Sequence, residues 1–206
     1  MSDVGYKPTA GEVKALRDQT QAGMMDCRQA LEESGGDMDA AKRWLREKGL
    51  AAAGKRAGRG TGAGVVESYV HATGTIGAMV EIGCETDFVA RNDTFKAFAR
   101  DVALQIAAGR LLQFVSEDEI PDDFKASELE IYRGKAAAEG KPENMLDKIA
   151  EGMWKKSLSE VVLLNQPSIR PEDDGKTIET IRAELSGTIG ENIEIKRFAR
   201  FEVGEE

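Results

Sequence analysis

The chain has 206 residues, of which 41% are hydrophobic and 32% are charged, and its formal net charge at pH 7 is -9. This length suits one domain, or a small domain joined to a larger one, and the acidic charge disfavours direct nucleic-acid binding, which usually needs a basic face. No apolar run reaches the roughly 20 residues of a membrane-spanning helix, and the N-terminal "MSDVGYKPTAGEVK" has no signal-peptide core, so we expect a cytoplasmic protein without a membrane partner.

The first two helices are predicted from caps and apolar spacing. Thr9 and Glu12 have the spacing of a capping box, in which each residue satisfies a free amide of the first helical turn. A second helix places Met24, Cys27 and Leu31 on one face and ends at Gly35 and Gly36. The N-terminal part of the chain is therefore expected to be helical.

A third helix should begin at Asp37, which is a good N-cap, and end before Gly49. The segment 54–64, "GKRAGRGTGAG", then holds five glycines and three basic residues, a composition typical of flexible linkers. We therefore predict a three-helix domain at residues 1–53, a flexible linker at 54–64, and a core at 65–206.

The core is predicted to combine strands with amphipathic helices. Residues 65–71 and 76–82 are β-rich runs around a short turn, which indicates a hairpin. A helix capped by Asp93 should follow and stop at Gly109, and a later helix should begin near Pro142. The apolar stripe of the first of these helices is Phe95, Phe98, Val102 and Ile106, and that of the second is Met145, Ile149 and Met153. A last helix, with the stripe Ile178, Ile181 and Leu185, should stop at Gly187.

The final segment, 192–203, alternates like a strand with one wet face. Arg197 and Phe198 break this alternation, which indicates a second contact surface on the sheet. The expected fold class is α+β, with a small antiparallel sheet packed by helices and a tethered three-helix head. The residues expected to face the core are Ile193, Ile195, Ala199, Phe201 and Val203.

Few residues support catalysis. His71 is the only histidine, and we interpret it as a structural strand residue. Cys27 and Cys84 show neither a zinc spacing nor a disulfide framework and are interpreted as buried free thiols. The stretch "GLAAAGKR" at 49–56 nearly matches a phosphate-binding loop, but Arg56 stands where Ser or Thr should bind magnesium. We therefore predict no catalytic residue, no metal site and no cofactor.

Several segments, in the right order, resemble the bacterial elongation factor Ts family, the guanine-nucleotide exchange factors of elongation factor Tu. The resemblance covers almost the whole chain, and the family's head is a ubiquitin-associated-like three-helix domain. It implies elongation factor Tu as the partner and exchange without covalent chemistry. The segments are "LRDQTQAGMMDCRQAL", "GTIGAMVEIGCETDFVARND", "GKPENM", "KIAEG", "EVVLLNQP" and "GENIEIKRFARFEVGE".

The resemblance assigns the central role to Thr86, Asp87, Phe88 and Val89. In the family this stretch disturbs the magnesium and phosphate side of the nucleotide site in elongation factor Tu. Phe88 would be an intruding wedge, because an exposed aromatic side chain must find a pocket on the partner. The alternative from the residues alone is that Phe88 is the first core aromatic of the helix that begins at Asp93.

The resemblance also implies that Arg17, Met24 and Met25 dock the head on the nucleotide-binding domain of the partner. Met24 and Met25 are adjacent and cannot both face one stripe, so one is free for a partner. The chain departs from the family's pattern at Gln21, where glycine is usual, and at Ser168, where an aromatic residue is common. Because longer family members carry an extra core subdomain and a coiled-coil insertion, a compact form would rely on a homodimer to present two cores.

Two other classes of function remain open. A protein-binding adaptor would use only the ubiquitin-associated-like head and would leave "TDFV" without a role. An RNA-associated ribosomal factor would use Lys55, Arg56 and Arg59, although a solvated linker and the acidic net charge argue against it.

Overall fold

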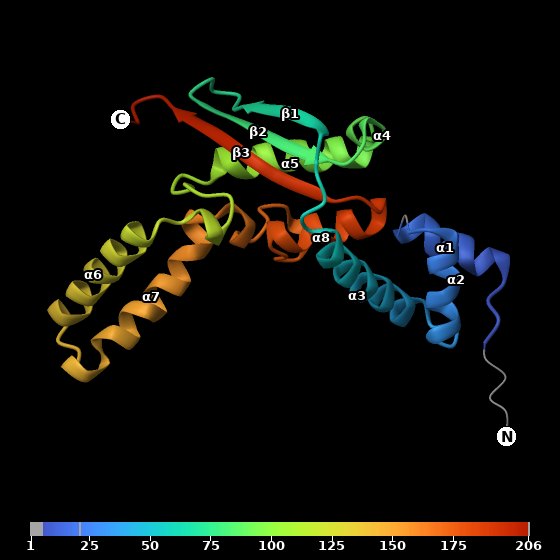
Figure 1. Cartoon of the computed structure of the whole chain (residues 1–206), viewed down its shortest axis with the longest axis horizontal. Helices are drawn as coiled ribbons and strands as arrows, with labels where there is room; N and C mark the ends of the chain where they lie inside the picture. Colours follow the sequence, from blue (N-terminus) through green and yellow to red (C-terminus); the bar gives the residue numbers. More distant parts are fainter. Residues whose placement is uncertain (1–5, 21, 206) are drawn as a thin grey trace. The chain divides into compact units, whose positions relative to one another are not determined.

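The computed structural model describes residues 6–20 and 22–205 (Figure 1). Gln21, one of the two departures from the family's pattern, lies outside the described residues. The chain forms two compact units, and each is assembled from three segments. The first contains Met1–Val65, Ile82–Lys96 and Thr180–Glu194, and the second contains Val66–Glu81, Ala97–Glu179 and Ile195–Glu206. Every described helix is too short or too polar to cross a bilayer.

The head consists of three helices: α1 (Ala10–Thr20), α2 (Met24–Glu33) and α3 (Met38–Arg56). The capping box is confirmed, because the Thr9 amide donates to Glu12 Oε2 at 2.7 Å and the Glu12 amide donates to Thr9 Oγ1 at 3.3 Å. Asp37 caps α3, as predicted, by accepting from the amides of residues 39 and 40. The buried core of the head is Val13, Leu16, Cys27, Ala30, Leu31 and Ala41.

Helix α3 is longer than the sequence indicated. The expected end at Gly49 is wrong, because α3 continues to Arg56 and takes residues 54–56 from the predicted linker. The alanines at 51–53 explain the extension: alanine has the highest helix propensity, and an interior glycine costs only about 1 kcal/mol. Ala53 is also buried, so the added turns are packed and not fully surrounded by solvent.

The second half of α3 contacts α8 (Ile178–Ile189), which runs on past the predicted stop at Gly187. The guanidinium of Arg56 donates through Nη1 to the carbonyl oxygen of Ser186 at 3.1 Å. Gly49 and Gly187 allow the two backbones to approach closely, since a Cβ atom added at Gly187 would lie 2.6 Å from Gly49 Cα. A side chain at position 187 would therefore force the helices apart.

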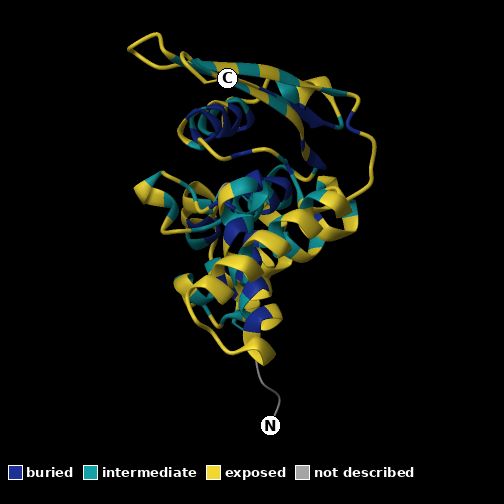
Figure 2. Ribbon diagram, turned by 90° about the vertical axis from the view of Figure 1, so that its left-hand side faces the viewer, coloured by how far each residue is buried: buried dark blue, intermediate teal, exposed yellow. Residues whose placement is uncertain are grey.

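The sheet has three strands in the order β1 (Ala63–Val70), β2 (Ile76–Cys84) and β3 (Ile193–Glu202), and it is antiparallel as predicted. Helix α5 (Asp93–Ala108) lies beside it (Figure 1), and half of its residues are buried, drawn dark blue in Figure 2. The predicted stripe of α5 is confirmed, but its cap is Asn92 rather than Asp93: Asn92 Oδ1 accepts from the amides of Thr94 and Phe95.

The alternation of β3 changes phase along the strand. Ile193 and Ile195 are buried as predicted, whereas Ala199, Phe201 and Val203 are exposed, so the inward assignment of these three is wrong. Two consecutive exposed residues, Lys196 and Arg197, mark the change. Beyond them the partly buried residues are Phe198, Arg200 and Glu202, and the Arg200 guanidinium donates to the Ala107 carbonyl oxygen at 3.2 Å.

Two further helices, α6 (Asp122–Ala138) and α7 (Leu146–Val161), pack side by side (Figure 1). The sequence analysis did not identify α6. It also placed the stripe of α7 one position early: Met145 lies in a preceding 3-10 turn and is exposed, and Ile149 and Met153 are only half-buried. The buried residues of α7 are Leu146, Ala150, Trp154 and Ser157, and the 3-10 turns are Glu117–Glu119, Glu143–Met145, Leu163–Asn165 and Pro171–Asp173.

The contact of α3 with α8 can be tested with Gly187→Ala. We expect this change to lower the free energy of unfolding by about 1–3 kcal/mol, because the new methyl group overlaps Gly49. Gly54→Ala is the matched control: position 54 is also helical, no atom lies within 4 Å of its added Cβ, and alanine favours the helix. Urea denaturation followed by circular dichroism measures both. Equal stability of Gly187→Ala and the parent protein would contradict the packing.

Candidate partner-binding site

The predicted wedge lies on a single helical turn directly after β2. Helix α4 (Asp87–Ala90) is closed by backbone hydrogen bonds from Ala90 to Thr86 at 3.2 Å and from Arg91 to Asp87 at 3.2 Å. Asn92, which caps α5, also donates its amide to the Val89 carbonyl oxygen at 2.9 Å. The four residues "TDFV" are therefore ordered between a strand and a long helix.

Phe88 is 83% exposed, so it is not a core aromatic of the neighbouring helix. That position belongs to Phe95 and Phe98, which are 0% and 5% exposed. Val89, next to Phe88, is buried and anchors the turn to the chain's own interior. Of the two adjacent apolar side chains, one secures α4 and the other points away from the protein.

Asp87 and Thr86 each have a partner within the chain. The Asp87 carboxylate forms an ion pair with Arg91 at 3.0 Å, and both side chains are largely exposed. Such a surface pair contributes only about 0–1 kcal/mol. The Thr86 hydroxyl does not cap α4; it donates instead to Glu191 Oε1 at 2.6 Å.

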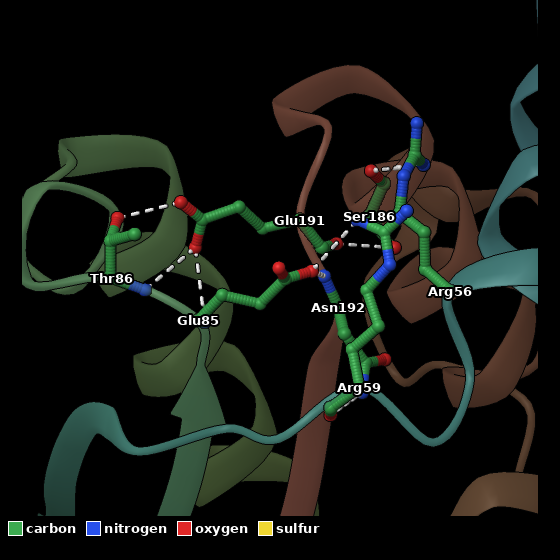
Figure 3. Close-up of polar contacts among 7 residues, drawn as sticks. All are labelled: Arg56, Arg59, Glu85, Thr86, Ser186, Glu191 and Asn192. Atoms are coloured by element: carbon green, nitrogen blue, oxygen red, sulfur yellow. Dashed lines mark hydrogen bonds and ion pairs between the residues drawn. The ribbon is translucent and has the colours of Figure 1, made fainter.

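Glu191 lies in the loop between α8 and β3, and it accepts hydrogen bonds from the residues just before α4 (Figure 3). Its Oε2 accepts the amides of Glu85 and Thr86, each at 3.0 Å. In return the Glu85 carboxylate accepts the Asn192 amide at 2.6 Å and pairs with Arg59 Nη1 at 3.5 Å. Glu191 was not predicted from the sequence, because 106 positions separate it from Glu85 and only the folded chain brings them together.

The thiol of Cys84 lies beneath this turn. It is buried and donates to the Thr86 carbonyl oxygen at 3.2 Å. Burial, together with the nearby negative charge of Glu191, raises the pKa of the Cys84 thiol, so it stays protonated at neutral pH. Burial likewise raises the pKa of Cys27. Both thiols therefore lack the thiolate character of a nucleophile.

The three residues expected to dock the head lie on α1 and α2. Arg17 is exposed near the end of α1, and Met24 and Met25 are 44% and 74% exposed at the start of α2. The inward side of α2 is supplied by Cys27 and Leu31, which are fully buried. Both methionines, rather than one, are thus available on the surface.

The exposed aromatic residue on α4 and the exposed methionines of the head are the side chains with which proteins bind other proteins. Across residues 6–20 and 22–205, no group of three or more His, Cys, Asp or Glu side chains is arranged to hold a metal ion. These exposed apolar side chains favour a role in binding another protein.

Comparison with known proteins gives the family. The family model "Elongation factor TS" matches residues 54–205. The chain is 52% identical over 198 residues to elongation factor Ts of Solidesulfovibrio magneticus, covering 96% of this chain and 98% of the relative. It is 54% identical over 193 residues to that of Thermosynechococcus vestitus, covering 94% of this chain and 64% of the relative. The chain therefore belongs to the elongation factor Ts family.

Members of this family are nucleotide exchange factors for elongation factor Tu in translation elongation; they are not enzymes, and they are cytoplasmic. The family assignment therefore favours the exchange factor over the adaptor. The RNA-associated alternative gains nothing from the structure, because Arg56 and Arg59 bind Ser186 and Glu85 of the same chain.

The exposure of Phe88 predicts how the protein responds to its removal. Phe88→Ala should change the free energy of unfolding by less than about 0.5 kcal/mol, because the ring has little contact to lose. Phe95→Ala, the matched control in the core, should cost about 3–5 kcal/mol. Chemical denaturation of both variants is the measurement, and a large loss for Phe88→Ala would return this residue to the core.

Proposed function

We propose that the chain releases GDP from elongation factor Tu by inserting Phe88 as a wedge on the magnesium and phosphate side of the nucleotide site. The observation that carries this proposal is an aromatic ring, 83% exposed, on a turn that is ordered at both ends. A buried aromatic anchor at a protein interface contributes roughly 2 kcal/mol or more. The ring also reaches its partner without unfolding any part of this chain.

The wedge works by differential binding. Exchange requires that the protein bind the nucleotide-free partner more tightly than the nucleotide-bound one, because coupling between two ligands is reciprocal. Binding that is too tight would trap the complex. A single exposed ring gives a contact that can loosen GDP and still be displaced by the incoming nucleotide.

The neighbours of Phe88 have separate roles in this proposal. Asp87 disturbs the hydrogen bonds around the magnesium ion, and its exposed pair with Arg91 is weak enough to open on contact. Val89 supports the wedge from inside the protein, and Thr86 holds the turn through its hydroxyl group. The "TDFV" stretch thus contains one wedge, one charge and two residues that fix the turn.

The head adds a second contact in this proposal. Arg17, Met24 and Met25 dock on the nucleotide-binding domain of elongation factor Tu, where methionine side chains adapt to the partner's surface. The division into a head at 1–53, a linker at 54–64 and a core at 65–206 stays part of the proposal. Within it, residues 54–56 extend the head as the last turn of α3.

Stopped-flow release of a fluorescent GDP analogue from elongation factor Tu tests the wedge. Phe88→Ala should slow the accelerated release about 30-fold, the equivalent of roughly 2 kcal/mol. Leu111→Ala is the control, because Leu111 is also an exposed apolar residue, 56% exposed, but lies outside the proposed contact. Release at the parent rate with Phe88→Ala would overturn the wedge.

We further propose that two copies associate through the uncovered face of the sheet. Apolar side chains from all three strands are exposed in the second unit: Val66, Val70, Met79 and Phe201. A sheet face of this kind is a typical contact surface. The homodimer would present two wedges from two compact chains.

Met79→Asp tests the association. A carboxylate in the middle of β2 should raise the dimer dissociation constant at least about tenfold, since an unpaired charge is costly to bury. Met145→Asp is the control: this methionine is also exposed but lies outside the sheet. Sedimentation equilibrium over a concentration series measures both, and a parent protein that stays monomeric would rule out the dimer.

A further inference from the structure

We propose that Glu191 is the positioning residue of the exchange site: it holds α4 in the conformation that presents Phe88 to the partner. This inference rests on the proposed role of Phe88 as the wedge. Glu191 belongs to a different segment from "TDFV", and its carboxylate bonds to Glu85 and Thr86, the two residues that lead into α4 (Figure 3).

Helix α4 cannot be stable alone, because it is a single turn of four residues. Forming one helical turn fixes several backbone dihedral angles for one hydrogen bond, so an isolated turn is unfavourable. Its N-cap residue, Thr86, makes no side-chain capping bond. Thr86 therefore does not fix the start of the turn through its own side chain, and the backbone amides that lead into the turn, those of Glu85 and Thr86, need an acceptor from elsewhere in the chain.

Glu191 is that acceptor. Its carboxylate takes the amides of Glu85 and Thr86, each at 3.0 Å, and the Thr86 hydroxyl at 2.6 Å. Hydrogen bonds to an ionised group are about twice as strong as bonds between neutral groups.

Glu191 is itself held in place. The buried Ser186 hydroxyl donates to the Glu191 carbonyl oxygen at 2.6 Å. The amide of the next residue, Asn192, donates to the Glu85 carboxylate at 2.6 Å, and its side chain donates to the Arg59 carbonyl oxygen at 2.9 Å. The two segments therefore exchange bonds in both directions, so neither can shift without the other.

This arrangement matters for exchange because a wedge must be ordered before it meets its pocket. If the turn were loose, only the fraction of molecules with α4 formed could bind productively, and the apparent affinity would fall by that fraction. Phe88 has no packing of its own that could hold it, since it is exposed. Val89 secures the turn from below, and Glu191 fixes where the turn begins.

The test compares GDP release with Glu191→Ala, Glu191→Gln and Glu194→Ala. Glu191→Ala should slow release about tenfold, whereas Glu191→Gln should restore most of the rate, because the amide oxygen still accepts both backbone amides. Glu194→Ala should match the parent protein. It removes the same charge from the same region, but the Glu194 carboxylate accepts the Thr61 hydroxyl at 2.5 Å, whereas the amides of Glu85 and Thr86 donate to Glu191.

Two readouts separate positioning from general structural support. Amide hydrogen exchange of residues 85–91 should become faster in Glu191→Ala, while the amides of α5 keep their protection. In the Phe88→Ala background, Glu191→Ala should have no further effect on release, because it acts only through the wedge. A further independent slowing in that background would overturn the inference.

The two proposals fail in different ways. If elongation factor Tu releases GDP at the parent rate in the presence of Phe88→Ala, the proposed wedge is wrong. If release is slow with Phe88→Ala but runs at the parent rate with Glu191→Ala, the wedge stands and the positioning role is wrong. Should Glu191→Ala fail to fold, Thr86→Val replaces it, because this variant removes only the hydroxyl bond to Glu191; a parent rate together with unchanged exchange at 85–91 would then count against positioning.

Discussion

The pairing of β2 with β3 is the constraint on which the site depends. These strands are neighbours in the sheet although most of the chain separates them in sequence. Their pairing brings the end of β2, with Glu85 and Thr86, to the start of β3, with Glu191 and Asn192. Phe88, the proposed wedge, can stand exposed because this long-range contact fixes the backbone next to it.

The proposed exchange site combines an ordered turn with an exposed aromatic side chain. An aromatic ring in water gives up the stabilisation of about 1.5–3 kcal/mol that burial would provide, and the neighbouring residues compensate by supporting the turn. Val89 is buried, Cys84 donates to the Thr86 carbonyl oxygen, and Glu191 accepts the amides of residues 85 and 86. Such preorganisation favours binding, because little conformational entropy remains to be lost when the partner arrives.

The elements that the sequence predicted well are those governed by local rules. The capping box at Thr9, the cap at Asp37 and the stripe of α5 depend on residues within a few positions of one another. The errors arose where distant parts of the chain decide. Beyond Gly49, α3 packs against α8 through Gly49 and Arg56, and the inward residues of β3 depend on the change of phase at Lys196 and Arg197.

Local patterns were enough to predict the α+β class and the head of three helices, and the resemblance of the motifs indicated the family and singled out the "TDFV" stretch. That Phe88 is exposed while Val89 is buried became clear from the folded chain, because helical spacing does not say which side of a short turn meets the core. The tertiary structure alone revealed Glu191, since a carboxylate in a loop carries no local signal. Caps and stripes are short-range physics, whereas exposure and cross-chain hydrogen bonds exist only once the strands have paired.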